Sequence, residues 1–226
     1  MNGYGLRIRL EELIQSRHLL ETSFYKRWTA GTVSHEELQG YAKEYYQFEK
    51  EFPRFISAVH SKCEDLEMRQ MLLENLIDEE RGENNHPELW MRFAEGLGVR
   101  RDELQNHFHS DETEHLLRNF RDATGSAHVV DGLAALYAYE RQQPEVVRQK
   151  IDGLKRYYGL SDERSVDFFR VHQVADVHHA ETEISLLERL CDDEEMKERA
   201  VLVVQRTLDT LYDFLDGVER RYRPAA

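Results

Sequence analysis

Hydrophobic residues recur every three to four positions along nearly the whole chain, the spacing typical of amphipathic helices. No segment keeps the apolar–polar alternation of a half-buried strand, so the pattern predicts an all-α protein. The predicted helices span residues 4–20, 21–30, 34–60, 64–84, 87–97, 110–122, 127–158, 163–190 and 193–222. Because no repeat or linker separates them, we expect a single domain over residues 1–226, a bundle of about seven main helices.

Capping residues and breakers support several of these boundaries. Ser34 and Ser110 each precede an acidic first turn, where a hydroxyl cap and the helix dipole both favour a helix start. Gly159 fits a helix end. Pro53 and Pro144 fall inside long periodic stretches, and we expect them to kink the helices there.

Ionisable residues interrupt an apolar stripe on the segment 163–190. At 100° per residue, Asp176 and His179 point within about 40° of the direction of His172, on a face that is apolar at both ends. Burying an uncompensated aspartate costs several kcal/mol, whereas a divalent cation would remove that cost and accept both nitrogen and oxygen donors. A solvated or salt-bridged patch is the alternative for this segment taken alone.

Two further segments carry acids on apolar faces. Glu140 shares a face with Leu133 and Leu136, and a buried glutamate–arginine pair is the alternative to metal binding there.

On the segment 64–84, an apolar face continues through Glu79, Glu83 and His86, and periodicity does not choose between the two glutamates. Pro87 leaves open whether His86 ends this helix or precedes a new one.

Together these segments supply about six inward donors, the number that a pair of metal ions needs. The predicted ligands are Glu79, His86, Glu140, His172, Asp176 and His179. A ferritin-like set would instead use the motifs Glu83-x-x-His86 and Glu112-x-x-His115. We disfavour it because Glu112 is explained by the helix start at Ser110, and because the two motifs are too close in sequence to leave a whole helix between them.

Charge and cysteine content narrow the function classes. The formal net charge of −14 argues against nucleic acid and anionic membranes as partners, because both attract clustered positive charge. Cys63 and Cys191 lack the spacing of a zinc site and are typical of free thiols in a reducing compartment. The N-terminus has no apolar signal core, and no apolar run approaches membrane-spanning length, so we expect a soluble, cytoplasmic protein.

Three segments of the chain share a specific arrangement of acids and histidines. They are NLIDEERGENNHPELWMRFAEGLGV, ALYAYERQQPEVVRQKIDGLKRYYG and DFFRVHQVADVHHAE. They carry Glu-x6-His, then a lone Glu, then His-x3-Asp-x2-His. This arrangement resembles the haem-oxygenase-like dimetal oxidases of the TenA/PqqC fold group, in particular the p-aminobenzoate synthases similar to the chlamydial protein associating with death domains (CADD). The resemblance covers about residues 10–215.

This resemblance implies a fold, a cofactor and a reaction. The fold would be a haem-oxygenase-like helical bundle, and the ligands would be the six donors above, with Glu79 rather than Glu83. The cofactor would be two divalent ions, iron with iron or manganese, acting with O2 and an external reductant. The product would be p-aminobenzoate for folate biosynthesis, made from the protein's own tyrosine with a lysine as amino donor.

The positions that match the tyrosines and the lysine are Tyr25, Tyr41 and Lys150. The resemblance implies that one tyrosine, Tyr25 in preference to Tyr41, is consumed. The helical pattern alone would not have singled them out. It treats the two tyrosines as ordinary core or interface aromatics, and it expects Lys150 to be solvated beyond the Pro144 kink.

Three other functions remain open from the sequence. A dimetal oxidase could act with turnover on an external small amine or fatty acid. A metal-free TenA/PqqC-like enzyme could be a hydrolase that uses a nucleophilic cysteine. Asp192 and Asp193, however, should raise the pKa of Cys191 and make its thiol a weaker nucleophile. The third is a protein that binds helical partner domains. The resemblance also implies a homodimer.

Overall fold

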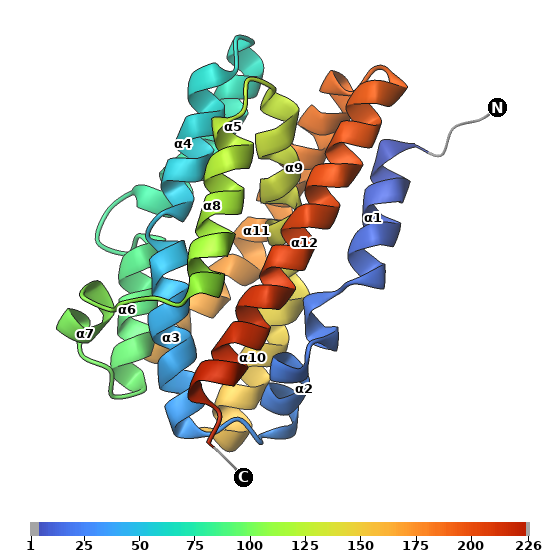
Figure 1. Ribbon diagram of the computed structural model, residues 1–226. Coiled ribbons are helices and arrows are strands. Elements are labelled where there is room, and N and C mark those ends of the chain that lie inside the picture. Colours follow the sequence, from blue (N-terminus) through green and yellow to red (C-terminus); the bar gives the residue numbers. More distant parts are fainter. Residues whose placement is uncertain (1–4, 225–226) are drawn as a thin grey trace.

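The computed structural model describes residues 5–224, and these residues form helices without any strand, which confirms the all-α prediction (Figure 1). Most of the helices run along one long axis, and the two longest, α11 and α12, extend through much of its length (Figure 1). The helices are α1 Leu6–Ser16, the 3-10 helix Leu19–Glu21, α2 Ser23–Ala30, α3 His35–Glu49, α4 Phe52–Lys62, α5 Leu66–Glu80, α6 His86–Gly96, α7 Arg101–Gln105, α8 Asp111–Gly125, α9 Val129–Glu140, α10 Gln143–Tyr157, α11 Glu163–Leu190 and α12 Glu194–Tyr222.

Helix α9 is the central element of the bundle. It packs against α8, α11 and α12, and every residue from Val130 to Glu140 is buried. A helix that is apolar on all sides can be stable only when other helices surround it. Its last residue, Glu140, is therefore carried into the interior of the protein.

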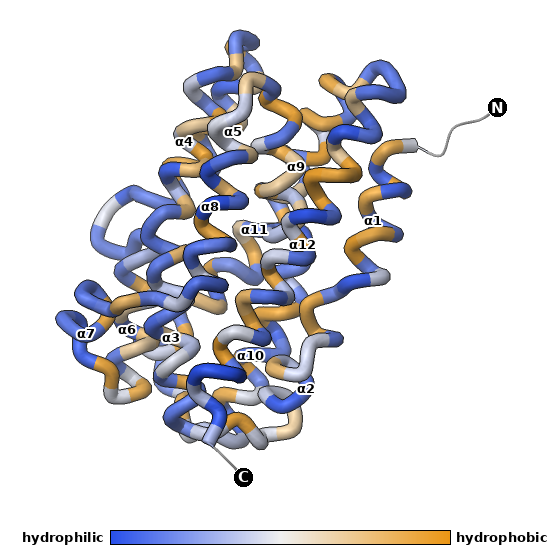
Figure 2. Tube along the Cα trace, viewed as in Figure 1, coloured by the Kyte–Doolittle hydropathy of each residue, from blue (hydrophilic) through white to orange (hydrophobic). Residues whose placement is uncertain are grey.

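Most surface helices are amphipathic, and Figure 2 shows hydrophobic positions recurring along each of them among hydrophilic ones. None of the helices in residues 5–224 combines the length and the apolar character needed to cross a membrane.

The two prolines end helices instead of kinking them. The predicted helix 34–60 is divided into α3 and α4, and 127–158 is divided into α9 and α10, with Pro53 and Pro144 in the first turns of the later helices. Proline lacks the N–H that an interior position needs, whereas the first turn leaves that group unpaired in any case. The count of about seven main helices was therefore too low.

Other boundaries differ by a few residues. The start of the predicted helix 4–20 lies outside the described residues, and α1 ends at Ser16. Helix α5 ends at Glu80, and a new helix, α6, begins at His86. The sequence had left open whether His86 ends the earlier helix, and the structure places it in the separate helix α6. The caps Ser34 and Ser110 are confirmed, since each hydroxyl accepts a hydrogen bond from a first-turn N–H.

A buried carboxylate ties the C-terminal helix to the rest of the bundle. Glu44 of α3 is fully buried, and five groups from outside its helix donate hydrogen bonds to it: His107 Nε2, Ser110 N, Thr113 Oγ1, Arg221 Nη1 and Tyr222 Oη. Burial raises the pKa of this carboxyl, but the hydrogen bonds from His107, Thr113 and Ser110 outweigh burial and lower the pKa to about 2.

Replacing this carboxylate should lower stability in a pH-dependent way. The pKa of Glu44 is depressed in the folded protein, so its contribution is complete above about pH 4.5 and is lost as pH falls towards 2. The difference between the two pKa values corresponds to roughly 3 kcal/mol. Urea unfolding of Glu44→Gln should show a deficit of that size at pH 7 that shrinks towards pH 2. The exposed Glu12→Gln should show none, and a pH-independent deficit would contradict the assignment.

Candidate metal centre

Four helix ends meet the middle of the long helix α11. Helix α3 ends at Glu49, α5 brings Glu79 in its last turn, α6 begins at His86, and α9 ends at Glu140. They surround the segment of α11 that carries His172, Asp176 and His179. All six predicted ligands are buried, at most 3% exposed.

Local sequence explains the turn between Glu79 and His86. Arg81 leaves helical geometry, Gly82 adopts a left-handed conformation with φ of 78°, and the Asn85 side chain caps α6 by accepting the N–H of Glu88. Pro87 occupies the first turn, where proline is best tolerated. The chain therefore reverses within five residues and turns both Glu79 and His86 inwards.

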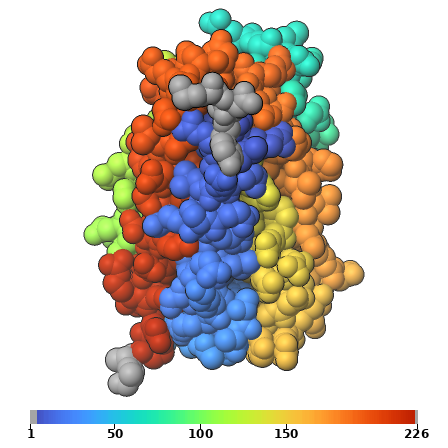
Figure 3. All heavy atoms as spheres, turned by 90° about the vertical axis from the view of Figure 1, so that its right-hand side faces the viewer, coloured from blue at the N-terminus to red at the C-terminus, as the bar shows by residue number. Residues whose placement is uncertain are grey.

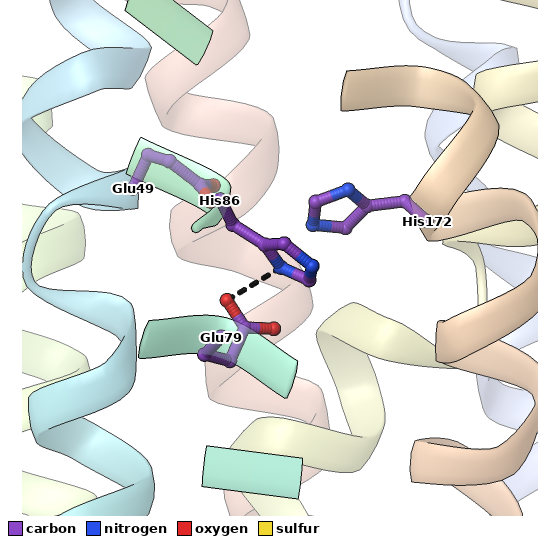
Figure 4. A group of neighbouring side chains, drawn as sticks. All are labelled: Glu49, Glu79, His86 and His172. Carbon is purple, nitrogen blue, oxygen red and sulfur yellow. Dashed lines mark ion pairs between the residues drawn. The ribbon is translucent and has the colours of Figure 1, made fainter. Parts of the chain in front are cut away.

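The donors form two groups that share one carboxylate. In the first, Glu79, His86, His172 and Glu49 each place one donor atom within 4.8 Å of the others, and Figure 4 shows the four side chains converging. Glu79 Oε2 lies 2.7 Å from His86 Nδ1. The second group joins Glu79 with Glu140 and His179. Glu79 is therefore the residue that the two groups have in common.

Asp176, the remaining predicted ligand, belongs to neither group but lies beside His179 of the second. His179 Nδ1 lies 3.1 Å from Glu140 Oε1 and 3.9 Å from Asp176 Oδ1. His172 Nδ1 donates to the Phe168 carbonyl oxygen at 2.8 Å, which leaves Nε2 with a free lone pair. Metal-binding histidines usually hold their second nitrogen in this way, because the bond fixes the tautomer and the ring orientation.

Several carboxylate oxygens of this centre lack hydrogen-bond partners. Among the described residues, both oxygens of Glu79, both of Asp176 and one of Glu140 are buried without one. A buried, unpaired acceptor costs about 1–3 kcal/mol, and more when it is charged. Divalent cations satisfy carboxylate and imidazole donors together, so these residues fit a pair of such ions.

Without an ion, burial and the neighbouring carboxylates shift the pKa values of the ionisable groups in this core. Burial, followed by the charges of Glu140 and Glu79, raises the pKa of Asp176 well above its ordinary value. Burial lowers the pKa of His179, but its hydrogen bond with Glu140 and the nearby acids prevail and raise it to about 9. Bound cations would instead favour ionised carboxylates and neutral imidazoles.

The alternatives for these residues do not match the geometry. Glu83 and His115 are exposed, and Glu112 pairs with Arg220, so the ferritin-like set is not brought together. Glu140 does not form the expected arginine pair, since the neighbouring Arg141 contacts Glu11 instead.

The sequence pattern did not predict two buried glutamates that lie beside the predicted ligands. Glu49 belongs to the first donor group, and Glu183 is fully buried beside Glu140. Glu183 lies seven residues after Asp176 and four after His179, so it shares their stripe, and this spacing could have revealed it. Glu49 follows Tyr45 by one helical turn. A single helix over residues 34–60 does not predict which way Glu49 points, because the chain changes direction directly after it.

A second buried cluster contains Tyr25, Tyr41 and Lys150, the other positions that the resemblance singled out. Tyr25 Oη lies 3.2 Å from Tyr41 Oη, and Lys150 Nζ donates to Tyr41 Oη at 2.9 Å. Lys150 Nζ also lies 5.1 Å from the centroid of the Tyr25 ring. All three are buried, at most 4% exposed, so the expectation of a solvated lysine was wrong. Helix α10 begins at Gln143 and packs against α2, and its Lys150 side chain reaches Tyr41 of α3.

Burial is also the main influence on these titratable groups. It lowers the pKa of Lys150 to about 7, against the opposing charges of Glu49 and Asp176, and it raises the pKa of Tyr25. Near neutral pH the amine is therefore partly unprotonated and nucleophilic, while the phenol keeps its proton.

A surface cleft of about 460 Å³ reaches the metal centre from outside. Arg7 and Glu11 of α1 line one side, Arg141 and Tyr137 line another, and Asp176 contributes to its lining. Helix α1 lies along the outer face of the bundle in Figure 3, between α12 and the helices α10 and α11. Small molecules could approach Asp176 by this cleft.

The thiols do not support a cysteine-dependent activity. Burial, together with the charges of Asp193 and Asp192, raises the pKa of Cys191 to about 11. Burial also raises the pKa of Cys63. Both are therefore poor nucleophiles near neutral pH.

Comparisons with known proteins give a consistent result. A family of iron-containing redox enzymes related to haem oxygenases matches residues 39–212. The 4-aminobenzoate synthase of Chlamydia trachomatis is 43% identical over 210 residues, which cover 92% of this chain and 90% of that protein. The 4-aminobenzoate synthase of Nitrosomonas europaea is 40% identical over 223 residues, covering 95% and 91%. A TenA homolog from Pseudomonas syringae shares the fold, with a TM-score of 0.81 at 17% identity over 95% of this chain and 93% of the other.

Proposed function

Because this chain belongs to the family of iron-containing redox enzymes, we propose that it is a 4-aminobenzoate (p-aminobenzoate) synthase that consumes its own Tyr25. Two divalent ions, iron with iron or manganese, would be held by Glu79, His86, Glu140, His172, Asp176 and His179. When bound, these ions supply the chemistry that activates O2. The product would serve folate biosynthesis.

The observation that carries the self-sacrifice proposal is the enclosed cluster around Lys150. Its Nζ lies between 5.1 and 5.6 Å from the centroids of four rings, and all four belong to the protein itself: Tyr25, Tyr45, Tyr41 and Phe169. 4-Aminobenzoate consists of a para-substituted ring, an amino group and a carboxyl group. Tyr25 and Lys150 would supply the first two from side chains already in contact through Tyr41.

Each of these side chains has a distinct part. Tyr41 Oη accepts from Lys150 and shares a hydrogen bond with Tyr25 Oη, so it holds the amine near the phenol and offers a path for a proton. Lys150 near its pKa of about 7 presents an unprotonated amine to the ring. Phe24 and Trp28 pack edge-on against Tyr25 and exclude water from the cluster.

The atoms of this reaction balance with O2 as the oxidant. Cleavage of the Cα–Cβ bond of Tyr25 with uptake of one O2 gives glycine and a carboxyl group that contains both oxygen atoms. Exchange of the ring hydroxyl for the amine turns the end of Lys150 into an aldehyde and releases two electrons and two protons. A second O2 takes these, together with two electrons and two protons from an external reductant, and forms two water molecules.

Product yield per chain tests this function. With ferrous and manganous ions, reductant and O2, we expect at most one 4-aminobenzoate per polypeptide. Mass spectrometry of the same sample should show peptides in which Tyr25 has lost its side chain, in proportion to product. Product in excess of one per chain, alongside intact Tyr25 peptides, would rule out self-sacrifice.

One specific observation favours an alternative. The cleft at Asp176 could admit an external small amine or fatty acid to a dimetal oxidase that works with turnover. That enzyme would keep Tyr25 intact and consume the added compound, so the yield experiment separates the two functions.

A further inference from the structure

Helix α3 ends in a carboxylate that the rest of the protein leaves without a partner. Glu49 is 1% exposed, and its Oε1 atom is buried without a hydrogen-bond partner among residues 5–224. An acid at a helix C-terminus also faces the negative end of the helix dipole, so helix stability does not explain it. Its position is costly unless something else compensates the charge.

This carboxylate faces one group of predicted ligands. One of its oxygens lies within 4.8 Å of donor atoms on Glu79, His86 and His172 (Figure 4). Metal–ligand distances of about 2.0–2.2 Å place donors on opposite sides of one ion up to roughly 4.4 Å apart. The four donor atoms lie within 4.8 Å of one another, which is close to this limit, so they can belong to a single ion.

We propose that Glu49 is a further ligand of the ion held by Glu79, His86 and His172, an inference that rests on the two-metal centre of the proposed function. With Glu49, this ion has two nitrogen and two oxygen donors. The other ion has Glu79, Glu140, His179 and the adjacent Asp176. Each ion then has four protein donors, with Glu79 shared between them.

The charges in the core support the same assignment. Glu79, Glu140 and Asp176 carry three negative charges when ionised, whereas two divalent ions bring four positive charges. Glu49 supplies the fourth carboxylate in this buried region, and Glu183 adds no charge because burial and the charge of Glu140 raise its pKa well above the ordinary value, so the four negative charges balance the two ions. A net charge buried at this depth would cost several kcal/mol.

The neighbouring residues hold Glu49 in place from its own helix and from the next one. Phe48 packs edge-on against Tyr139, and Phe52 lies 5.0 Å from the same ring, centroid to centroid. Tyr139 precedes Glu140, so the ends of α3 and α9 are fixed against one another. The backbone that carries Glu49 is thereby held in place before any ion binds, which reduces the entropy cost of binding.

Metal titration of Glu49→Leu tests this inference without measuring enzymatic activity. Calorimetric titration with Mn²⁺, checked by elemental analysis, should give two ions per wild-type chain. In the variant we expect one site to weaken by about 10–100-fold and the other to stay within a few-fold. Glu49→Gln should be intermediate, because its amide oxygen still donates without the charge. Glu51→Gln is the matched control, since it removes a charge two residues away that pairs with Arg54.

Thermal unfolding separates a ligand from a merely structural residue. If Glu49 is a ligand, the leucine variant should unfold at a higher temperature than wild type without metal, because an unpaired buried charge is gone, and should gain less from Mn²⁺. Two sites of wild-type affinity in Glu49→Leu would overturn the assignment of Glu49 and leave the two-metal proposal standing. Fewer than two ions in the wild-type protein would overturn the two-metal proposal, and this inference with it.

Discussion

Tyr25→Phe is expected to abolish 4-aminobenzoate formation while the protein still folds and binds metal. The variant keeps the ring that packs on Phe24 and Trp28 and loses only the hydroxyl that bonds to Tyr41, a loss of about 1 kcal/mol. Without the phenol oxygen, the para carbon has no group to exchange for the amine of Lys150. Liquid chromatography with mass spectrometry after incubation with iron, manganese, reductant and O2 measures the yield.

Two further variants make this result specific. Tyr41→Phe should lower the yield without removing it, because Tyr41 aligns the amine and the phenol but contributes no atoms to the product. Tyr158→Phe, half-buried with its ring 5.9 Å from Trp28, should match the wild type and controls for removal of a nearby phenol. A wild-type yield from Tyr25→Phe would refute the assignment of the consumed ring.

Glu79→Leu should have the second large effect, the loss of both ions and of all product. Glu79 is the only residue that belongs to both donor groups in the described part of the chain, so its removal deprives each ion of a ligand. Leucine fills a similar volume, although it also removes the contact of Glu79 Oε2 with His86 Nδ1, so the variant should still fold but should no longer be stabilised by added metal. Elemental analysis and thermal unfolding give the two readouts.

The adjacent glutamate provides the control for this variant. Glu80 is exposed on the outer face of α5, so Glu80→Gln should bind two ions and form product at the wild-type level. If Glu79→Leu retained two ions with unchanged affinity, Glu79 would not be a bridging ligand. The donor residues would then have to be divided between the two ions in another way.

Sequence periodicity predicted the part of the site that lies on one helix. His172, Asp176 and His179 point in one direction because the geometry of α11 fixes their angular separation, and the structure buries all three on that face. The same reasoning failed where helices end. It could not choose between Glu79 and Glu83, because α5 stops at Glu80 and a turn redirects the chain.

The sequence by itself determined the helical class, several of the helix starts and the inward face of α11, because each depends on residues within one or two turns. Only the tertiary structure decided that Glu49 joins Glu79, His86 and Glu140 at that face, and that the helical pattern's solvated Lys150 is buried against Tyr25 and Tyr41. The physical reason is that a side chain near a helix end is buried by other helices, and its neighbours come from distant parts of the chain. Local spacing carries no information about which helix ends will meet.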